Sequence, residues 1–214
     1  MIIIGAKGFA KELLEIAAQN GELENLAFYD DISPDMPVIL YGRFPVLRNE
    51  ASVRKYFAET DPRFTIGIGN PLLRKKMYDL FTGWGGQCTA TISRQAEIGS
   101  FSAVVGEGCN ILSGAKISNG ASIGKACIVY YNSIITHDVT AGDFVEISPG
   151  AVLLGHCHIG DYTHVGGGAI VLPNLTVGKH VKIAAGAVVT KDVPDHVTVA
   201  GVPAVIKNNP VTNG

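Results

Sequence analysis

Aliphatic residues recur at every sixth position between residues 111 and 189, and this period restricts the possible folds more than any other feature of the chain. An α-helix repeats about every 3.6 residues and a β-strand every second residue, so neither produces a strict period of six. Such a repeat is typical of a parallel β-helix, in which three hexads form one coil and residues roughly 18 apart stack. The inward series is Ile111, Ile117, Ile123, Val129, Ile135, Ala141, Ile147, Leu153, Ile159, Val165, Val171, Val177, Ile183 and Val189.

A shorter segment with the same period precedes this series but is one residue out of register. Its inward positions would be Ile92, Ile98 and Val104. Because both segments should belong to one β-helix, we predict that the register slips at Glu107–Asn110.

The residue before each inward aliphatic should point outward, and these residues form columns. Two of the columns are mostly polar, whereas the third is aliphatic throughout. An exposed apolar stripe favours burial against a partner, so we predict a subunit interface on this face. Cover by the chain's own terminal segments is the alternative. The stripe consists of Ile134, Val152, Ile170 and Val188.

The composition excludes several functional classes. A net charge of −2 over 214 residues gives no electrostatic reason to expect nucleic-acid or membrane binding. No apolar run approaches the roughly 18 residues of a membrane span, and the first residues lack the pattern of a signal peptide. Cys109, Cys127 and Cys157 occupy small inward positions of the repeat, so we expect buried thiols in a reducing cytoplasm and no acyl-cysteine chemistry.

Residues 1–86 have a different pattern, in which short apolar strands alternate with helices. This alternation predicts a small parallel α/β unit of the Rossmann-like type. Glycines at 83–86 mark the boundary with the β-helix at 87–207, and 208–214 form a tail. The expected strands are 1–4, 26–29 and 64–68, and the expected helices are 9–20, 51–59 and 71–81.

Ligands of parallel sheets bind beyond the carboxyl ends of the strands. In this unit those ends carry Gly5–Gly8, Asp30-Asp31 and Gly69-Asn70. Backbone amides at the start of the first helix could hold a phosphate, and the carboxylates suit a ribose or a base. A tight turn and a solvated turn are the structural alternatives. Because the unit is small for a whole dinucleotide, we favour a nucleotide-sugar.

His137 is the candidate for proton transfer in the β-helix. It follows inward Ile135 by two residues, near a corner beside the aliphatic stripe. Gly155 lies one coil away, at about 4.8 Å by strand spacing, and His156 stacks over Asp138 in the same way. A base, a carboxylate and an amide without a side chain therefore converge. The alternative is a surface histidine, and solvated or interface roles are what we expect for His156, His158 and His164.

Several motifs together carry a resemblance to a known family over about residues 1–207. The chain resembles the NeuD/PglD-type sugar acetyltransferases of the hexapeptide-repeat, left-handed β-helix acyltransferase superfamily. The resemblance implies acetyl-CoA as co-substrate, no metal, and a homotrimer with active sites between subunits. The motifs are Gly5-Ala6-Lys7-Gly8, Asp30-Asp31, Ile68-Gly69-Asn70 with Arg74-Lys75, Thr136-His137-Asp138, Gly142-Asp143-Phe144 and Val199–Ala204.

The resemblance also implies roles for individual residues. His137 matches the catalytic base, Asp138 the acid that raises its basicity, and Gly155 the amide that faces the thioester carbonyl. Glu146 departs from the pattern, because the amino-sugar enzymes carry a second histidine at this contact to acetyl-CoA or the sugar amine. Backbone contacts to coenzyme A match Gly167 and Ala185. Nucleotide-sugar contacts match Lys7, Gly8, Asp30, Asp31 and Gly69.

We therefore predict direct N-acetylation of a nucleotide-linked (UDP- or dTDP-type) 4-amino-deoxy sugar, for surface glycan biosynthesis. O-acetylation of sialic acid or a related sugar is the alternative within the family. A zinc enzyme resembling the γ-carbonic anhydrases needs three converging histidines, whereas His158 and His164 fall on different sides of the prism. A non-catalytic scaffold is the third possibility, and failure to bind acetyl-CoA would favour it.

Overall fold

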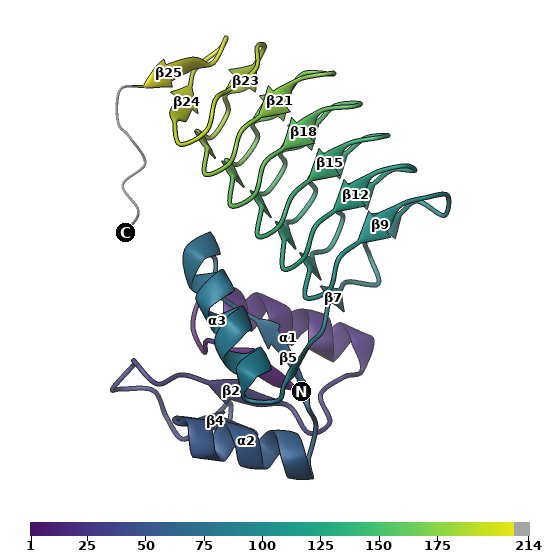
Figure 1. Ribbon diagram of the computed structural model, residues 1–214. Coiled ribbons are helices and arrows are strands. Elements are labelled where there is room, and N and C mark those ends of the chain that lie inside the picture. The colour runs from purple at the N-terminus through teal and green to yellow at the C-terminus, as the bar shows by residue number, and fades with distance from the viewer. Residues whose placement is uncertain (208–214) are drawn as a thin grey trace. The chain divides into compact units, whose positions relative to one another are not determined.

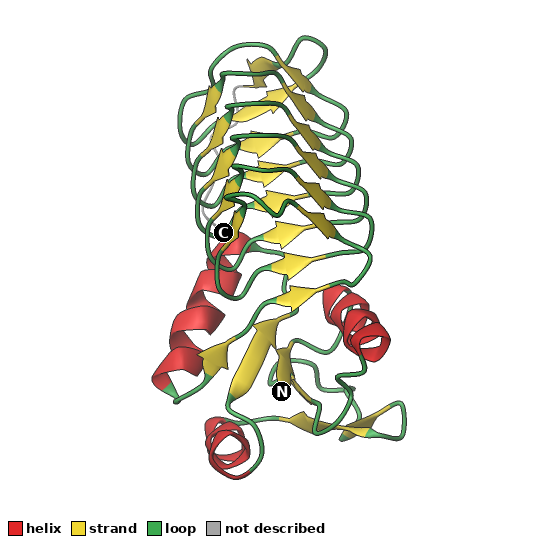
Figure 2. Ribbon diagram, turned by 90° about the vertical axis from the view of Figure 1, so that its right-hand side faces the viewer, coloured by secondary structure: helices red, strands yellow, loops and turns green. Residues whose placement is uncertain are grey.

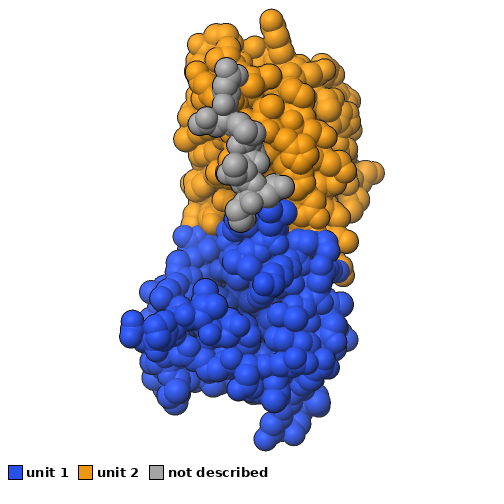
Figure 3. Space-filling view, turned by 60° about the vertical axis from the view of Figure 1, so that its left-hand side comes forward, with its two compact units in different colours: residues 1–91 blue, residues 92–214 orange. Residues whose placement is uncertain are grey.

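The computed structural model describes residues 1–207, which divide into two compact units between Thr91 and Ile92 (Figures 1 and 3). The first unit contains all the described helices, and the second consists of short strands (Figure 2). Within residues 1–207, no helix is both long and apolar enough to span a membrane.

A six-stranded sheet forms the centre of the first unit, in the order β3-β4-β2-β1-β5-β6. Its strands pair in parallel, except that β3 is antiparallel to β4. The antiparallel strands β3 and β4 form a short hairpin after β2. The strands are β1 (Ile2–Ile4), β2 (Ala27–Tyr29), β3 (Ile39–Leu40), β4 (Phe44–Leu47), β5 (Arg63–Ile66) and β6 (Gln87–Cys88).

Three helices, α1 (Phe9–Asn20), α2 (Glu50–Glu59) and α3 (Pro71–Gly83), cover the sheet. Right-handed crossovers to opposite sides of β1 place α1 on one face and α2 and α3 on the other. The core on the α2/α3 face is aromatic, and Phe57, Phe64 and Phe81 meet there with ring centroids 5.6–6.3 Å apart.

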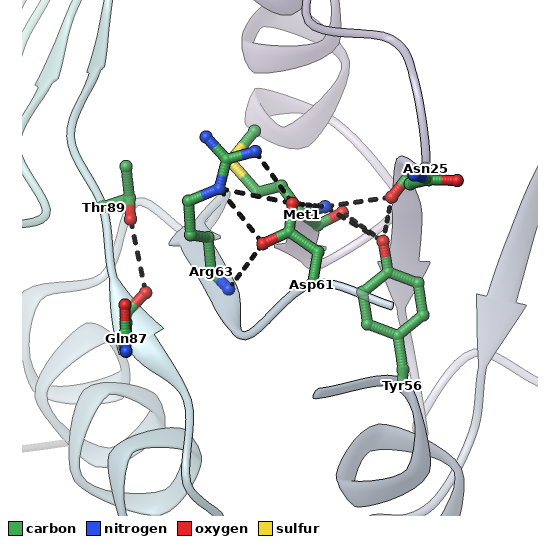
Figure 4. A network of polar contacts seen from close by, with 7 residues as sticks. All are labelled: Met1, Asn25, Tyr56, Asp61, Arg63, Gln87 and Thr89. Carbon is green, nitrogen blue, oxygen red and sulfur yellow. Dashed lines mark hydrogen bonds and ion pairs between the residues drawn. The ribbon is translucent and has the colours of Figure 1, made fainter. Parts of the chain in front are cut away.

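A polar network closes the amino end of β1 (Figure 4). The Met1 ammonium donates to Asp61 Oδ2 at 2.8 Å and to the Tyr56 hydroxyl at 2.9 Å, and Arg63 pairs with the same carboxylate. Burial raises the pKa of Asp61, but hydrogen bonds from Arg63 and the ammonium outweigh it and hold that pKa below its ordinary value of 3.8. The ionised carboxylate therefore stabilises the folded unit.

We expect Asp61→Asn to lower the free energy of unfolding by about 1.5–3 kcal/mol at pH 7, because a hydrogen-bonded, half-buried charge is lost. A carboxyl whose pKa is depressed on folding stabilises fully above its unfolded value and loses this effect as pH falls. The difference from wild type should thus shrink below pH 3.8. Urea unfolding at pH 7 and pH 3 measures it. Asp79→Asn, which breaks an exposed pair with Lys75, is the matched control and should cost about 0–1 kcal/mol.

The second unit is a parallel β-helix whose strands stack in three columns (Figures 1 and 2). The strands have two residues each, except the three-residue β24 and β25, and β25 ends the first column antiparallel to β24. The first column is β7 (Thr91–Ile92), β10 (Asn110–Ile111), β13 (Ile128–Val129), β16 (Glu146–Ile147), β19 (His164–Val165), β22 (Lys182–Ile183), β24 (Thr198–Ala200) and β25 (Val205–Lys207). The second is β8 (Glu97–Ile98), β11 (Lys116–Ile117), β14 (Ile134–Ile135), β17 (Val152–Leu153), β20 (Ile170–Val171) and β23 (Val188–Val189). The third is β9 (Val104–Val105), β12 (Ser122–Ile123), β15 (Thr140–Ala141), β18 (His158–Ile159) and β21 (Thr176–Val177).

The inward residues and the stacking register agree with the repeat. The inward aliphatics form one buried core, and Ile134, Val152, Ile170 and Val188 stack in adjacent strands as predicted. Ile134 is 37% exposed and the other three are half-buried. The stripe therefore exists on the outside of the second column.

The predicted position of the register slip is wrong. Ile98 pairs with Ile117 and Val105 pairs with Ile123, so the extra residue lies between β8 and β9. Five residues, 99–103, connect these strands, whereas four connect β9 to β10. Val105 is consequently the inward residue, and Val104 points outward with 54% exposure. Because Val104 and Val105 are adjacent and identical, the sequence does not indicate which of them points inward.

Candidate active site

The corner between β14 and β15 presents His137 and Asp138 to solvent. Asp138 has φ 58°, a left-handed conformation that Asp adopts more readily than most residues. This turns the chain between two strands and leaves both side chains outside the core. His137 Nδ1 lies 2.9 Å from Asp138 Oδ2, which fits an Nδ1–H donating to the carboxylate. That tautomer leaves the Nε2 lone pair free to accept a proton.

Gly155 lies directly against the His137 ring, one coil along the β-helix. A Cβ atom at Gly155 would be 2.6 Å from His137 Cε1 and 2.8 Å from Nε2. Any side chain would therefore displace the imidazole. The Gly155 N–H donates no hydrogen bond to any residue within 1–207, although the residue is buried. An unused buried donor beside Nε2 is suited to an anionic oxygen.

His156 extends this cluster. Its Nε2 lies 3.7 Å from Asp138 Oδ2, and its ring meets that of His137 edge-on, with centroids 5.2 Å apart. The repeat placed His156 over Asp138, but the sequence favoured a solvated or interface role. The structure adds that one carboxylate faces two imidazoles, and all three side chains are about half exposed or more.

The four residues matched to coenzyme A contacts fall into two groups. Gly155 lies at the His137 corner, between the second and third columns. Gly167 and Ala185 lie at the corner between the first and second columns, where the Gly186 N–H donates to the Gly167 carbonyl at 2.9 Å. Glu146 lies on the first column, beside that second corner. The two groups thus occupy opposite edges of the face that carries the aliphatic stripe.

His158 and His164 have separate partners. His164 Nε2 lies 2.9 Å from the Ser148 hydroxyl and 3.6 Å from Glu146 Oε1. His158 Nδ1 contacts the Thr140 hydroxyl on the third column. These two imidazoles belong to different columns, so a three-histidine zinc site of the carbonic-anhydrase type does not form within the described part of this chain.

A hollow of about 630 Å³ lies on the coils that precede the His137 corner, and neither His137 nor Asp138 lines it. Asn119 at its rim is in the neighbouring coil, where its carbonyl accepts the Asp138 N–H at 3.3 Å. The exposed ring of Phe101 forms part of the wall. Neither residue was predicted from the sequence, and the 18-residue spacing of Asn119 and His137 was the signal available for Asn119.

In the first unit, the carboxyl end of β1 leads into helix α1, whose N-terminus has no side-chain cap. Gly8 at the cap has φ 40°. Gly5 has φ 93°, and Lys7 is exposed. Helix amides without a side-chain cap suit an anion such as phosphate. The structure thus keeps Lys7 and Gly8 at the position where the sequence predicted phosphate contacts.

The two aspartates after β2 have different environments. Asp30 is buried, and its Oδ1 accepts the backbone N–H groups of Ser33 at 2.8 Å and Ile32 at 3.2 Å. This carboxylate therefore holds its own loop. Asp31 is exposed and faces Tyr29, and burial together with that carboxylate raises the pKa of Tyr29 to about 12. Asp31 is the one of the pair that can reach a ligand.

The loop after β5 is held by two residues that the sequence did not single out for this purpose. Arg74 is fully buried, and its guanidinium donates to the Gly69 carbonyl. Gly67 lies so close to α1 that a Cβ there would be 2.7 Å from Ala10 Cα. These contacts fix Gly69 near the same sheet edge as Gly5 and Asp31.

Fold and site together define a hexapeptide-repeat acyltransferase with a Rossmann-like N-terminal unit. The PglD N-terminal domain family matches residues 1–81, and the bacterial transferase hexapeptide family matches residues 156–191. No curated protein sequence matches the chain.

Solved structures identify the family. The acetyltransferase domain of PglB from Neisseria gonorrhoeae is 31% identical with a TM-score of 0.86, and the match covers 96% of this chain and 98% of that one. WeeI from Acinetobacter baumannii is 32% identical with a TM-score of 0.85, covering 96% and 98%. Perosamine N-acetyltransferase from Caulobacter crescentus is 29% identical with a TM-score of 0.90, covering 97% and 96%. The chain belongs to the PglD-type sugar acetyltransferases of the hexapeptide-repeat superfamily, which confirms the predicted family, the left-handed β-helix and the acyltransferase class.

Proposed function

We propose that this protein transfers the acetyl group of acetyl-CoA to the amine of a nucleotide-linked 4-amino-deoxy sugar in the cytoplasm, as a step of surface glycan assembly. The observation that carries the proposal is the His137 corner, where a carboxylate-bound imidazole lies against a glycine with an unused N–H. The Caulobacter relative was crystallised with CoA and GDP-perosamine, which supports an amino sugar as the acceptor. The Neisseria relative was crystallised with acetyl coenzyme A, which supports the donor.

In the proposed reaction His137 acts as general base. A sugar ammonium cannot attack a carbonyl, so it first loses one proton to the solvent. The amine that forms loses a second proton as it attacks, and Nε2 accepts that proton, while Nδ1–H donates to Asp138 and the carboxylate stabilises the resulting imidazolium. The amine nitrogen bonds to the thioester carbon, and the carbonyl oxygen becomes an oxyanion near the Gly155 N–H. The C–S bond then breaks, and the imidazolium returns a proton to the leaving thiolate.

The two groups of coenzyme A residues suggest how the donor binds. Gly167 and Ala185 are separated from His137 by the full width of the face that carries the stripe. If a second copy covers that face, the Gly167 corner of one subunit can meet the His137 corner of its neighbour. We therefore propose a homotrimer with acetyl-CoA between adjacent subunits.

The first unit is proposed to hold the nucleotide. The N-terminus of α1 would face the phosphates, and Asp31 would accept hydrogen bonds from the ribose or base. We expect Asp31→Ala to raise KM for the nucleotide-sugar by roughly tenfold, the effect of losing one charged hydrogen bond of about 1.4 kcal/mol, and to leave KM for acetyl-CoA nearly unchanged. Asp35→Ala, in the same exposed loop, is the control. Equal increases in both KM values would contradict the assignment.

The test of the function is a panel of nucleotide-linked sugars incubated with acetyl-CoA, with free thiol release as the readout. The panel should contain UDP-, dTDP- and GDP-linked 4-amino sugars, matched 4-hydroxy sugars, and sialic acid. Release that requires the amino group supports the proposal. Turnover of sialic acid or of the hydroxy sugars alone would replace it with O-acetylation.

A further inference from the structure

The cluster of His137, Asp138 and His156 offers metal ligands as well as a base. One ligand atom from each residue lies within 4.8 Å of the other two, and all three side chains are exposed. The distances are 2.9 Å from His137 Nδ1 to Asp138 Oδ2 and 3.7 Å from His156 Nε2 to the same oxygen. Two imidazoles and a carboxylate, with an open fourth position for water, are a ligand set that Zn²⁺ accepts in tetrahedral geometry.

We propose that Zn²⁺ binds reversibly to His137 Nδ1, Asp138 and His156 and inhibits the enzyme. Bonds of about 2.0–2.1 Å to nitrogen place tetrahedral ligands roughly 3.4 Å apart. The exposed rings reach this spacing by small side-chain rotations, because neither histidine is enclosed. A hard cation such as Mg²⁺ is excluded by the nitrogen ligands, since it prefers an octahedral oxygen shell.

Inhibition follows from the chemistry of the imidazole and rests on the proposed role of His137. A neutral imidazole has one lone pair on a ring nitrogen and one N–H. In the active arrangement Nδ1 carries the proton and Nε2 carries the lone pair. A zinc ion on Nδ1 takes the lone pair at that nitrogen and leaves the proton on Nε2. The nitrogen that should accept the proton of the amine is then a donor, and the base is lost.

His156 is the one proposed zinc ligand that does not belong to the catalytic pair of His137 and Asp138. It touches Asp138, but the proposed reaction does not use it. Its φ is 60°, which asparagine also tolerates, so His156→Asn removes the ligand without straining the corner. His196 has the same φ of 60°, is exposed, and stacks on His180 away from this cluster. His196→Asn is therefore a matched control for a histidine lost from a left-handed corner.

The experiment measures zinc binding and acetyl transfer separately on the full chain. Calorimetric titration with ZnCl₂, without substrates, should show one tight site per chain in wild type and in His196→Asn. His156→Asn should weaken it at least about tenfold, because loss of a ligand costs no less than loss of an outer-shell partner. In the thiol-release assay, zinc should inhibit wild type, EDTA should restore full activity, and His156→Asn should stay active while needing about tenfold more zinc for half inhibition.

Equal zinc affinity in wild type and His156→Asn would overturn the site, because the ion would then bind elsewhere. If His156→Asn lost the heat of zinc binding but zinc did not inhibit the wild-type enzyme, the inhibitory role would be overturned. EDTA that abolished activity, with zinc restoring it, would contradict both the inhibition and the expectation that catalysis needs no metal. The calorimetric titration needs no turnover. If the proposed function alone were wrong, the zinc-binding result could therefore still be interpreted.

Discussion

Replacing His137 with alanine is expected to lower kcat by roughly 10²–10⁴, the usual contribution of a positioned general base. The side chain lies outside the core and is 63% exposed, so its removal should leave no buried cavity and the variant should fold. Both substrates should still bind, because the proposed contacts to the nucleotide and to coenzyme A come from other residues. Activity should recover partly at high pH, where more of the sugar amine is already unprotonated.

Two further measurements make this result specific. Asp138→Asn should lower kcat less than His137→Ala does. It removes the carboxylate that orients the imidazole and stabilises the imidazolium, but it leaves the base itself in place. His158→Ala removes an exposed histidine that contacts Thr140 and should leave kcat within about twofold of wild type, as expected for a surface residue without a catalytic role. Near wild-type kcat for His137→Ala at neutral pH would contradict the assignment. Proton removal would then have to involve another group, with His164 and Glu146 next to be tested.

The second large effect is expected on the aliphatic face. Val152→Asp places a carboxylate in the middle of the stripe of Ile134, Val152, Ile170 and Val188. If this face lies in the subunit interface, the unpaired charge would be buried there and the trimer should dissociate. Acetyl transfer should then be lost as well, because the residues matched to coenzyme A lie at the two edges of this face. Light scattering and thiol release measure the two consequences.

The chain supplies a matched control for this substitution. Val104 also points outward from a two-residue strand, but it lies on the third column and is 54% exposed. Val104→Asp should keep the wild-type mass and activity. A wild-type mass near that of one 22.5 kDa chain would contradict the trimer directly. A Val152→Asp protein that stays trimeric would indicate that the subunit interface lies on another face.

The β-helix could be predicted from the sequence because its geometry is nearly one-dimensional. Once three hexads make a coil, the position of a residue in the chain fixes its column, its direction and its neighbours in the coils on either side. This is why the stacking of Gly155 on His137, and of His156 on Asp138, followed from spacing alone. The same rule failed at residues 99–103, where one added residue changes the inward valine from 104 to 105. A period cannot locate an insertion between two residues of the same type.

What only the tertiary structure decided is how individual polar groups are used. The sequence placed Asp30 and Asp31 together at the end of a strand, but folding buries Asp30 as an acceptor for its own loop and leaves Asp31 exposed. Likewise, the residues matched to coenzyme A contacts form one set by family resemblance and two groups in space, because corners of a prism are separated by its faces. Whether two groups form a hydrogen bond depends on differences of about an ångström in the positions of their side chains. The spacing of residues in the sequence does not specify positions this finely. The repeat therefore determined where the candidate site lies, and the packed chain determined which of its polar atoms are left without a partner.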